Sequence, residues 1–416
     1  MLINILIVFL FFIGLLVNYK KTVFWVACLF PILHMIAGIG PIPLIRVLGI
    51  VSIALSLIWH WQDVKQCPII YVAIPFIIIC AISNYINERH TPSMFGYISE
   101  NAFLPIVMWN AVKGRTKLFF EISSIYFLIV CLYGYYEAIT NSNPFAMWAC
   151  SENNYFFAGY YKGYSEEIRF GVKRIQSLML WRDACGSLSA YYWGLLYYFK
   201  TYHPKILGDG WLKTLTTILM YMLPITVLLT GTRACIVVLL VCMIGTIRKI
   251  NVKIVIVGLG VAMLAFVFAA PYFDSIANSF SQTDSVSGSN VELREQQLVA
   301  VLMTLRNSPL FGNGFGSWQD YSLYAEDLLG AESIWFQLLL KVGVLGTLFY
   351  IIMLITIARR LFLTHTYYGL VMLAAFIIGL TLSSLPGLSL PYVLIYTGMM
   401  VCSNQKLYIN NIKIYR

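Results

Sequence analysis

Charged residues are scarce in this chain: only 11% of its 416 residues are Asp, Glu, Lys or Arg. Soluble globular domains carry about 25%, so a water-soluble fold with a charged shell is excluded. Hydrophobic residues make up 60% of the chain, and the mean hydropathy is +0.78. The composition therefore indicates a protein that is embedded in the lipid bilayer.

Several other features are missing, and each absence removes a class of function. The nine cysteines form no CxxC pair and no metal-ligand spacing, so we expect small apolar fillers and no metal or cofactor. Cys150 and Cys185 both map to the outer side, and whether they pair stays open. There is no internal repeat, and the loops on the basic side are too short to hold a nucleotide-binding domain.

Long apolar runs recur from one end of the chain to the other. Runs of about 17–25 residues are long enough to cross a ~30 Å hydrocarbon layer as a helix. We therefore predict an all-α, polytopic integral membrane protein with about 12–13 transmembrane helices. The first run is short but lacks the basic leader of a signal peptide, so we count it as a span. The predicted spans are residues 2–18, 22–40, 43–60, 67–84, 94–112, 117–139, 177–199, 213–231, 234–247, 254–271, 332–358, 366–385 and 388–402.

Lysine and arginine concentrate in one set of loops, which predicts the orientation. Cytoplasmic loops hold these residues in excess, and most of the 28 here fall in clusters that map to one side. The net charge of +10 is thus mainly a topology signal and does not imply a nucleic-acid partner. The clusters lie at residues 20–21, 65, 113–117, 200–213, 248–253, 359–360 and 406–416.

We expect one transmembrane domain, residues 1–416, with two long extracytoplasmic loops at residues 140–176 and 272–331. The first loop is rich in Tyr and Phe, which suits sugar recognition but is also typical of an aromatic belt at the membrane interface. The second loop becomes helical at "VELREQQLVAVLMTLRNS", before Pro309. Loops of this length in a compact protein commonly carry function.

Two arginines on the outer side are candidates for binding an anion. Arg233, in "LLTGTRACIVVLL", lies in a hairpin between two apolar runs, where it either snorkels to the interface or acts in a site. Arg294, in "SNVELREQQ", starts the loop helix, where a solvated helix face is the alternative. A guanidinium fork bonds phosphate oxygens in pairs and stays charged at any working pH. Two such forks suit a lipid diphosphate.

Further polar residues on this side are candidates for binding substrate. Arg182 and Asp183, in "LMLWRDACGS", head another span and either line a cleft or pair with each other; Arg306 ends the loop helix. The segment "PLFGNGFGSW" is not a dinucleotide fingerprint, because no strand precedes it and no helix starts at its last glycine. Its Gly312, Gly314 and Gly316 instead permit backbone conformations that leave amides free for a phosphate or glycan.

Glu332 begins the apolar run "ESIWFQLLLKVGVLGTLFYIIMLITIA". As a helix of about 40 Å, this run is longer than the ~30 Å membrane core, so its first turns protrude into the interface. A carboxylate at a helix start is favoured by the macrodipole alone. Alternatively, a partly desolvated carboxylate is a general base for a sugar hydroxyl. Lys341, deeper in the run, either snorkels or pairs with Glu332.

The order of these segments resembles the O-antigen ligase and Wzy-type O-antigen polymerase superfamily. The resemblance covers residues 213–358, with "LLTGTRACIVVLL", "ELREQQ", "NSPLFGNGFGSW" and "AESIWFQLLLKVGVLG" in that order. It implies a bacterial inner-membrane, multi-pass glycosyltransferase of lipopolysaccharide biosynthesis, with a large, partly helical periplasmic loop and no metal or nucleotide. By position, Arg233 and Arg294 match the arginines thought to hold the diphosphate.

The resemblance also implies the partners of the protein. Undecaprenyl-diphosphate-linked oligosaccharide is the donor and the acceptor, within the membrane lipid, and a chain-length regulator protein is a further candidate. Ligases of the superfamily typically carry a His-Asn pair at the head of the helix after the loop. Glu332 and Ser333 stand there in this chain, which favours a polymerase. An O-antigen ligase and a lipid-linked oligosaccharide flippase, which usually shows internal repeats and short outer loops, remain the alternatives.

Overall fold

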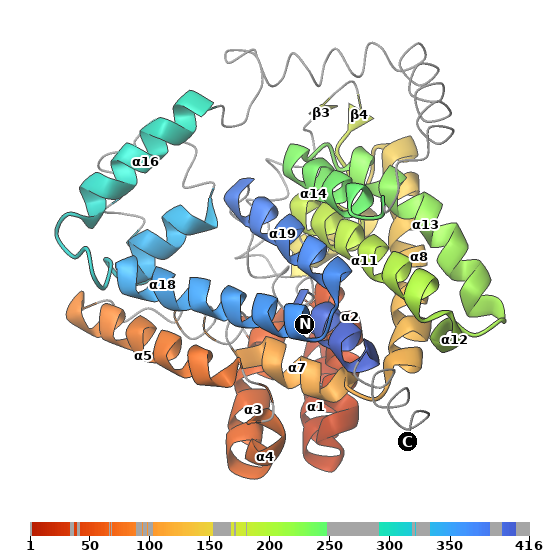
Figure 1. Cartoon of the computed structure of the whole chain (residues 1–416), viewed down its shortest axis with the longest axis horizontal. Helices are drawn as coiled ribbons and strands as arrows, with labels where there is room; N and C mark the ends of the chain where they lie inside the picture. The colour runs from red at the N-terminus through yellow and green to blue at the C-terminus, as the bar shows by residue number, and fades with distance from the viewer. Residues whose placement is uncertain are drawn as a thin grey trace.

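The computed structural model describes residues 2–33, 37–39, 42–65, 67, 69–88, 94, 98, 103–152, 168–169, 172–179, 181–247, 291–317, 321, 333–382 and 393–404. Helices dominate these ranges, and only two short antiparallel strand pairs join them (Figure 1). The prediction of an all-α, polytopic membrane protein is confirmed.

The helices follow the apolar runs of the sequence closely. They are α1 (Leu2–Val17), α2 (Tyr19–Leu33), α3 (Leu44–Trp59), α4 (Trp61–Val64), α5 (Ile70–Ile86), α7 (Leu104–Val112), α8 (Thr116–Thr140), α9 (Pro144–Glu152), α11 (Arg182–Tyr202), α12 (Pro204–Leu207), α13 (Trp211–Leu229), α14 (Arg233–Ile244), α16 (Val291–Leu305), α18 (Ile334–Leu363), α19 (Tyr367–Leu382) and an unlabelled helix, Val393–Asn404. The strand pairs are β1 (Ala37–Ile39) with β2 (Ile42–Pro43), and β3 (Ile168–Arg169) with β4 (Val172–Lys173).

Three helices in the described ranges are both long and apolar enough to cross a membrane: α8, α13 and α18. Shorter apolar helices accompany them, among them α5, α14 and α19. The predicted span at residues 254–271 lies outside the described residues. Each predicted span that falls within the described residues therefore contains a helix. Several of these helices are too short to cross the membrane completely.

Helix α11 has mostly buried residues and packs against α13 and α14. Its aromatic rings supply much of the interior. The ring of Tyr192 stacks on Phe127 of α8 at 4.1 Å between centroids, and its hydroxyl is 2.7 Å from the Ser124 hydroxyl. Because α11 is surrounded by other helices, it tolerates polar and aromatic residues that a lipid-facing helix would not.

Helices α18 and α5 pack side by side and form a second part of the structure, with α16 beside the first half of α18 (Figure 1). Ala300 and Val301 of α16 are buried with Leu340 of α18 and Tyr321. This contact confirms the helix predicted in the second outer loop, which ends at Leu305, before Pro309. Helix α18 is not continuous, because Gly343 adopts φ 64° and ψ −165° within it.

The two predicted loops are described only in part. Helix α9 and the β3–β4 pair lie in the first loop, and α16 lies in the second. Residues 153–167 and 272–290 lie outside the described residues. Cys185 is a free, buried thiol, so it forms no disulfide with Cys150.

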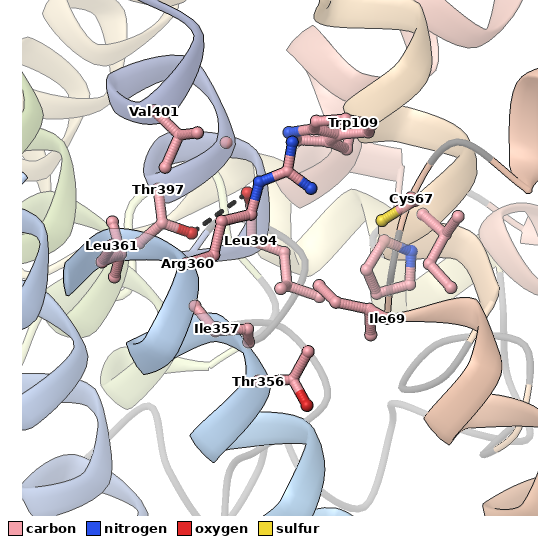
Figure 2. Close-up of a pocket in the computed structure, with 13 residues that line it drawn as sticks. Cys67, Ile69, Trp109, Thr356, Ile357, Arg360, Leu361, Leu394, Thr397 and Val401 are labelled. Carbon is pink, nitrogen blue, oxygen red and sulfur yellow. Dashed lines mark hydrogen bonds between the residues drawn. The ribbon is translucent and has the colours of Figure 1, made fainter. Parts of the chain in front are cut away.

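Several basic residues meet at one end of the structure. Nη1 of Arg115 donates to the carbonyl oxygen of Lys20 at 3.5 Å. The charged groups of Lys113 and Arg360 lie 5.4 Å and 5.5 Å from the centroid of the Trp109 ring. Figure 2 shows the Arg360 guanidinium beside that indole, in a pocket of about 30 Å³. A space this small holds only one or two water molecules. The contact between Arg360 and Trp109 joins α18 to α7.

Candidate active site

The candidate site lies at the opposite end, where several helices begin. Arg182 is the first residue of α11, Arg233 is the first residue of α14, and Arg294 lies in the first turn of α16. Ser333, the chain neighbour of Glu332, occupies the position directly before the first residue of α18. The amino-terminal ends of helices carry partial positive charge, so this arrangement favours anions.

The turn before Arg233 is built around Gly231. This glycine has φ +62°, and an added Cβ would lie 3.0 Å from Cγ of Arg174. Arg174 is buried and wraps the turn: Nε donates to the carbonyl oxygen of Thr230 at 2.8 Å, and Nη2 donates to the hydroxyl of Thr232 at 2.8 Å. A guanidinium suits this task because its donors are fixed in one plane. The turn is thus held rigid by Arg174, which comes from a different segment of the chain.

Asp183 completes the contacts of this turn. The Thr232 hydroxyl accepts from Arg174 and donates to Oδ1 of Asp183 at 2.7 Å, and Arg174 Nη2 lies 3.5 Å from the same carboxylate oxygen. The prediction left open whether Asp183 pairs with Arg182 or lines a cleft. The contacts described here join it to Arg174 and Thr232. Arg182 itself is buried beside it, at 5% exposure.

Close packing of α11 on α14 brings these residues together. A Cβ on Gly186 would lie 2.7 Å from Cβ of Cys235 and 2.9 Å from the Thr230 hydroxyl. A larger residue than glycine would therefore separate the two helix starts. Arginines at positions 174, 182 and 233 and one aspartate lie on these adjoining segments, so their net charge is positive.

A buried carboxylate on α8 supports the segment that carries Arg174. Glu137 of α8 is 3% exposed and accepts from the amides of Ser177 at 2.8 Å and Gln176 at 3.2 Å. Asn143 adds a hydrogen bond from Nδ2 to the carbonyl oxygen of Ser177, at 2.9 Å. Sequence reasoning missed both Arg174 and Glu137. Arg174 was detectable as a cation on the side where arginine and lysine are few.

Arg294 binds the carboxyl-terminal end of α19. Its Nη1 donates to the carbonyl oxygen of Thr381 at 3.0 Å, and its Nη2 donates to that of Leu382 at 2.8 Å. Trp335, in the first turn of α18, donates from Nε1 to the Thr381 hydroxyl at 3.0 Å. The starts of α16 and α18 therefore meet at this end of α19, whose partial negative charge the guanidinium offsets.

Helices α14 and α19 run antiparallel, which places Arg233 and Arg294 at the same end of this pair. The contacts run in opposite order along the two helices: the Tyr368 hydroxyl donates to the carbonyl oxygen of Cys242 at 3.0 Å, and Gly379 lies against Val238. From Val238 to Arg233 is about 7.5 Å along the axis, and from Gly379 to Leu382 is about 4.5 Å in the same direction.

The glycine segment differs from the expectation that its amides are free. The amide of Gly312 donates to the carbonyl oxygen of Ser308 at 2.8 Å, and the amide of Gly314 donates to that of Lys341 at 3.1 Å. All three glycines have positive φ, at 71°, 77° and 103° for Gly312, Gly314 and Gly316. The need for glycine was predicted correctly, but at Gly312 and Gly314 it serves a contact within the protein.

That contact is with the break in α18. The interrupted helix leaves the carbonyls of Leu340 and Lys341 and the amides of Val344 and Leu345 without helical partners, and residues 309–314 bind all four at 2.7–3.1 Å. Helix α5 fastens the same junction, since Asn87 Nδ2 donates to the carbonyl oxygen of Gly312 at 2.9 Å. The segment after α16 is thereby fixed to the helix that Glu332 precedes in sequence.

The remaining candidates are placed as follows. Glu332 lies outside the described residues, so its role stays a prediction, as does its pairing with Lys341. Arg306 is exposed, just beyond the end of α16. Lys341 donates from Nζ to Oε1 of Gln337 at 3.2 Å, one turn earlier in α18.

A comparison with protein families matches this part of the chain. Residues 217–351 fit the family model described as O-antigen ligase, from within α13 to within α18. This match supports membership in the O-antigen ligase and polymerase superfamily. The superfamily match contains Arg233, Arg294 and the glycine segment, whereas Arg174 and Arg182 precede it. A search of curated proteins found no match.

Proposed function

We propose that this superfamily member is a metal-independent glycosyltransferase of the inner membrane. In this proposal it polymerises O-antigen repeat units linked to a polyprenyl diphosphate, at the periplasmic face. The observation that carries the proposal is the position of Arg233 and Arg294 at one end of the antiparallel α14–α19 pair. Two guanidinium groups on a framework held by buried contacts suit one diphosphate.

The reaction requires the stabilisation of a leaving anion and the removal of one proton. The acceptor hydroxyl oxygen attacks the anomeric carbon of the donor sugar, and the bond from that carbon to the diphosphate oxygen breaks. The lipid diphosphate leaves with the electron pair, beside the charges of Arg233 and Arg294. Glu332 takes the hydroxyl proton.

The other predicted residues have supporting roles in this proposal. Arg182 and Asp183 adjoin the Thr232 turn and are proposed to orient the diphosphate or the first sugar. Gly316 and Arg306 are proposed to contact the glycan. Gly312 and Gly314 act through the placement of this segment against α18, since their amides are bonded within the protein.

The choice of polymerase over ligase rests on residues 332 and 333. The ligases that the chain resembles typically carry a His-Asn pair there, and this chain has Glu332 and Ser333. A carboxylate at position 332 can accept the proton of an acceptor sugar hydroxyl. An O-antigen ligase is the alternative activity within the superfamily, and a lipid-linked oligosaccharide flippase is the alternative outside it.

Purified protein with a lipid-diphosphate repeat unit tests the proposal directly. A ladder of products on a gel supports the polymerase. A single transfer to added lipid A core indicates the ligase, and movement of the substrate across a vesicle membrane without a covalent product indicates the flippase.

Two matched variants separate chemistry from folding in the same assay. Glu332→Gln keeps the size of the side chain but removes its ability to accept a proton, so the ladder should disappear. Glu295→Gln makes the same change on the exposed face of α16 and should leave the ladder intact. A full ladder from Glu332→Gln would show that another group takes the proton.

A further inference from the structure

A polar cavity of about 230 Å³ lies at the basic end of the structure, away from the candidate active site. It is formed between α2, the end of α3 and the end of α7. Its volume is many times the ~10–15 Å³ that a single water needs, so a small polar group and its hydrating waters fit inside. Its polar lining includes Tyr19, Lys20, His60, Asn110, Lys113 and Arg115.

The charge of the lining is of one sign. Lys20, Lys113 and Arg115 contribute three positive charges, and none of the described residues that line the cavity is acidic. Two described carboxylates at this end bind lysines elsewhere: Glu121 lies 4.0 Å from Lys117, and Asp209 lies 3.0 Å from Lys213. The described lining of the cavity is therefore basic.

Aromatic contacts hold the walls of the cavity in place. The rings of Tyr19 and His60 stack at 4.3 Å, and the Tyr19 hydroxyl contacts that of Ser56. The Arg115 guanidinium lies 5.6 Å from the Phe24 ring centroid and bonds the Lys20 carbonyl oxygen at 3.5 Å. These contacts position the aromatic and arginine side chains of the walls before a ligand binds, which lowers the entropy lost on binding.

The cavity adjoins a surface suited to lipid. Leu57, Ile58 and Trp59 are 49%, 69% and 64% exposed on the last turn of α3, directly before His60. Tryptophan commonly marks the level of the headgroups. An acyl chain along this apolar face would place its headgroup at the mouth of the cavity.

We propose that this cavity binds a phosphate-bearing anion, of the kind that an anionic glycerophospholipid presents in the cytoplasmic leaflet. Lysine and arginine donate charge-assisted hydrogen bonds to phosphate oxygens. The amide of Asn110 adds a neutral polar group to the lining. Inorganic phosphate offers the same chemistry without the acyl chains, and the experiment separates these two sources.

The test uses the full-length protein in neutral detergent, with the apparent unfolding temperature followed by tryptophan fluorescence. Phosphatidylglycerol, phosphatidylcholine with the same acyl chains, and sodium phosphate are titrated separately. A bound ligand raises the unfolding temperature in a saturable manner. We expect a shift with phosphatidylglycerol and none with phosphatidylcholine. A shift with sodium phosphate of equal size would identify free phosphate as the ligand of the same site.

Matched variants assign the shift to the cavity. The triple variant Lys20→Gln, Lys113→Gln, Arg115→Gln should lose it. A control triple, Lys117→Gln, Lys200→Gln, Lys213→Gln, removes as much charge outside the cavity and should keep it. Equal shifts with both lipids, no shift with any ligand, or equal loss in both triples would overturn the proposal. If the first triple does not fold, Lys113→Gln alone should raise the half-saturating lipid concentration roughly tenfold, and an unchanged value would contradict the site.

Discussion

Gly312 and Gly343 lie backbone against backbone. A Cβ on Gly312 would lie 2.5 Å from the amide nitrogen of Gly343, and a Cβ on Gly343 would lie 2.5 Å from the carbonyl oxygen of Leu310. Neither position can accept a methyl group unless the backbone shifts. The contact joins the segment after α16 to the break in α18, so it sets the position of the residues that flank Glu332 and Arg294.

The variant Gly343→Ala should therefore lower stability strongly. The new methyl group forces overpacking, which costs about 1–3 kcal/mol, and a non-glycine residue at this φ and ψ costs about 1–3 kcal/mol more. Gly208→Ala is a matched control, because Gly208 has φ 68° and ψ −173° but nothing within 4 Å of an added Cβ. The unfolding temperature in detergent should fall clearly further for Gly343→Ala, and equal losses would contradict the contact.

The sequence predicted helices well because apolar length and periodicity are local properties. Runs such as residues 117–139 and 366–385 became α8 and α19 with shifts of a few residues at their ends. Arg182 and Arg233 were found as candidates for the same reason: each is a charge at the start of an apolar run. The exact role of Gly312 was not predictable, because its partner Gly343 lies 31 positions away and depends on a helix break.

The contacts between distant segments could likewise not be predicted from the sequence. Arg174 lies 58 residues before Thr232, and nothing in either segment indicates that the two side chains meet. Glu137 was missed because it lies inside an apolar run, where its partners are backbone amides that no sequence pattern shows. Both residues satisfy buried polar groups, which is a property of the packed fold.

Arg174 and Thr232 provide a prediction about the turn before Arg233. Arg174→Lys keeps the charge but cannot donate to Thr230 and Thr232 in the same plane. Hydrogen bonds from a charged group contribute about 1.5–3 kcal/mol, so we expect product formation to fall more than tenfold. Lys173→Ala, which removes the neighbouring cation, should have little effect. The measurement is polymer ladder intensity at equal protein abundance in membranes.

The Thr232 hydroxyl can be tested separately. Thr232→Ser keeps a group that accepts from Arg174 and donates to Asp183, whereas Thr232→Val keeps the shape and removes both hydrogen bonds. We expect Thr232→Ser to retain most of the activity and Thr232→Val to lose it. If both variants were equally active, the hydroxyl would not position the turn, and the role assigned to these contacts would be wrong.

His203 predicts how stability depends on pH. Burial lowers the pKa of this imidazole, and its hydrogen bond with Asn404 opposes that effect in part. The folded protein therefore favours the neutral form. Above the ordinary pKa of about 6.5 both states are neutral and stability does not change. Below that value the unfolded chain binds the proton first, so stability falls as the pH is lowered. His203→Gln should reduce this decline between pH 7.5 and 5.5, whereas exposed His365→Gln should preserve it.

Arg233 and Arg294 give the prediction that bears most directly on the proposed chemistry. Removal of a group that stabilises a developing anion costs about 2.7–4 kcal/mol, or about 10²–10³ in rate, so Arg233→Ala and Arg294→Ala should nearly abolish polymer. Lysine should not rescue either position, because a point charge does not reproduce the planar fork. Arg294 also binds the end of α19, so its variants need a control for folding. An Arg294→Lys variant that kept the wild-type unfolding temperature but lost the ladder would separate the role of Arg294 in the reaction from its contact with Thr381 and Leu382. Wild-type polymer length from Arg233→Ala would reject the assignment of this end of the structure as the active site.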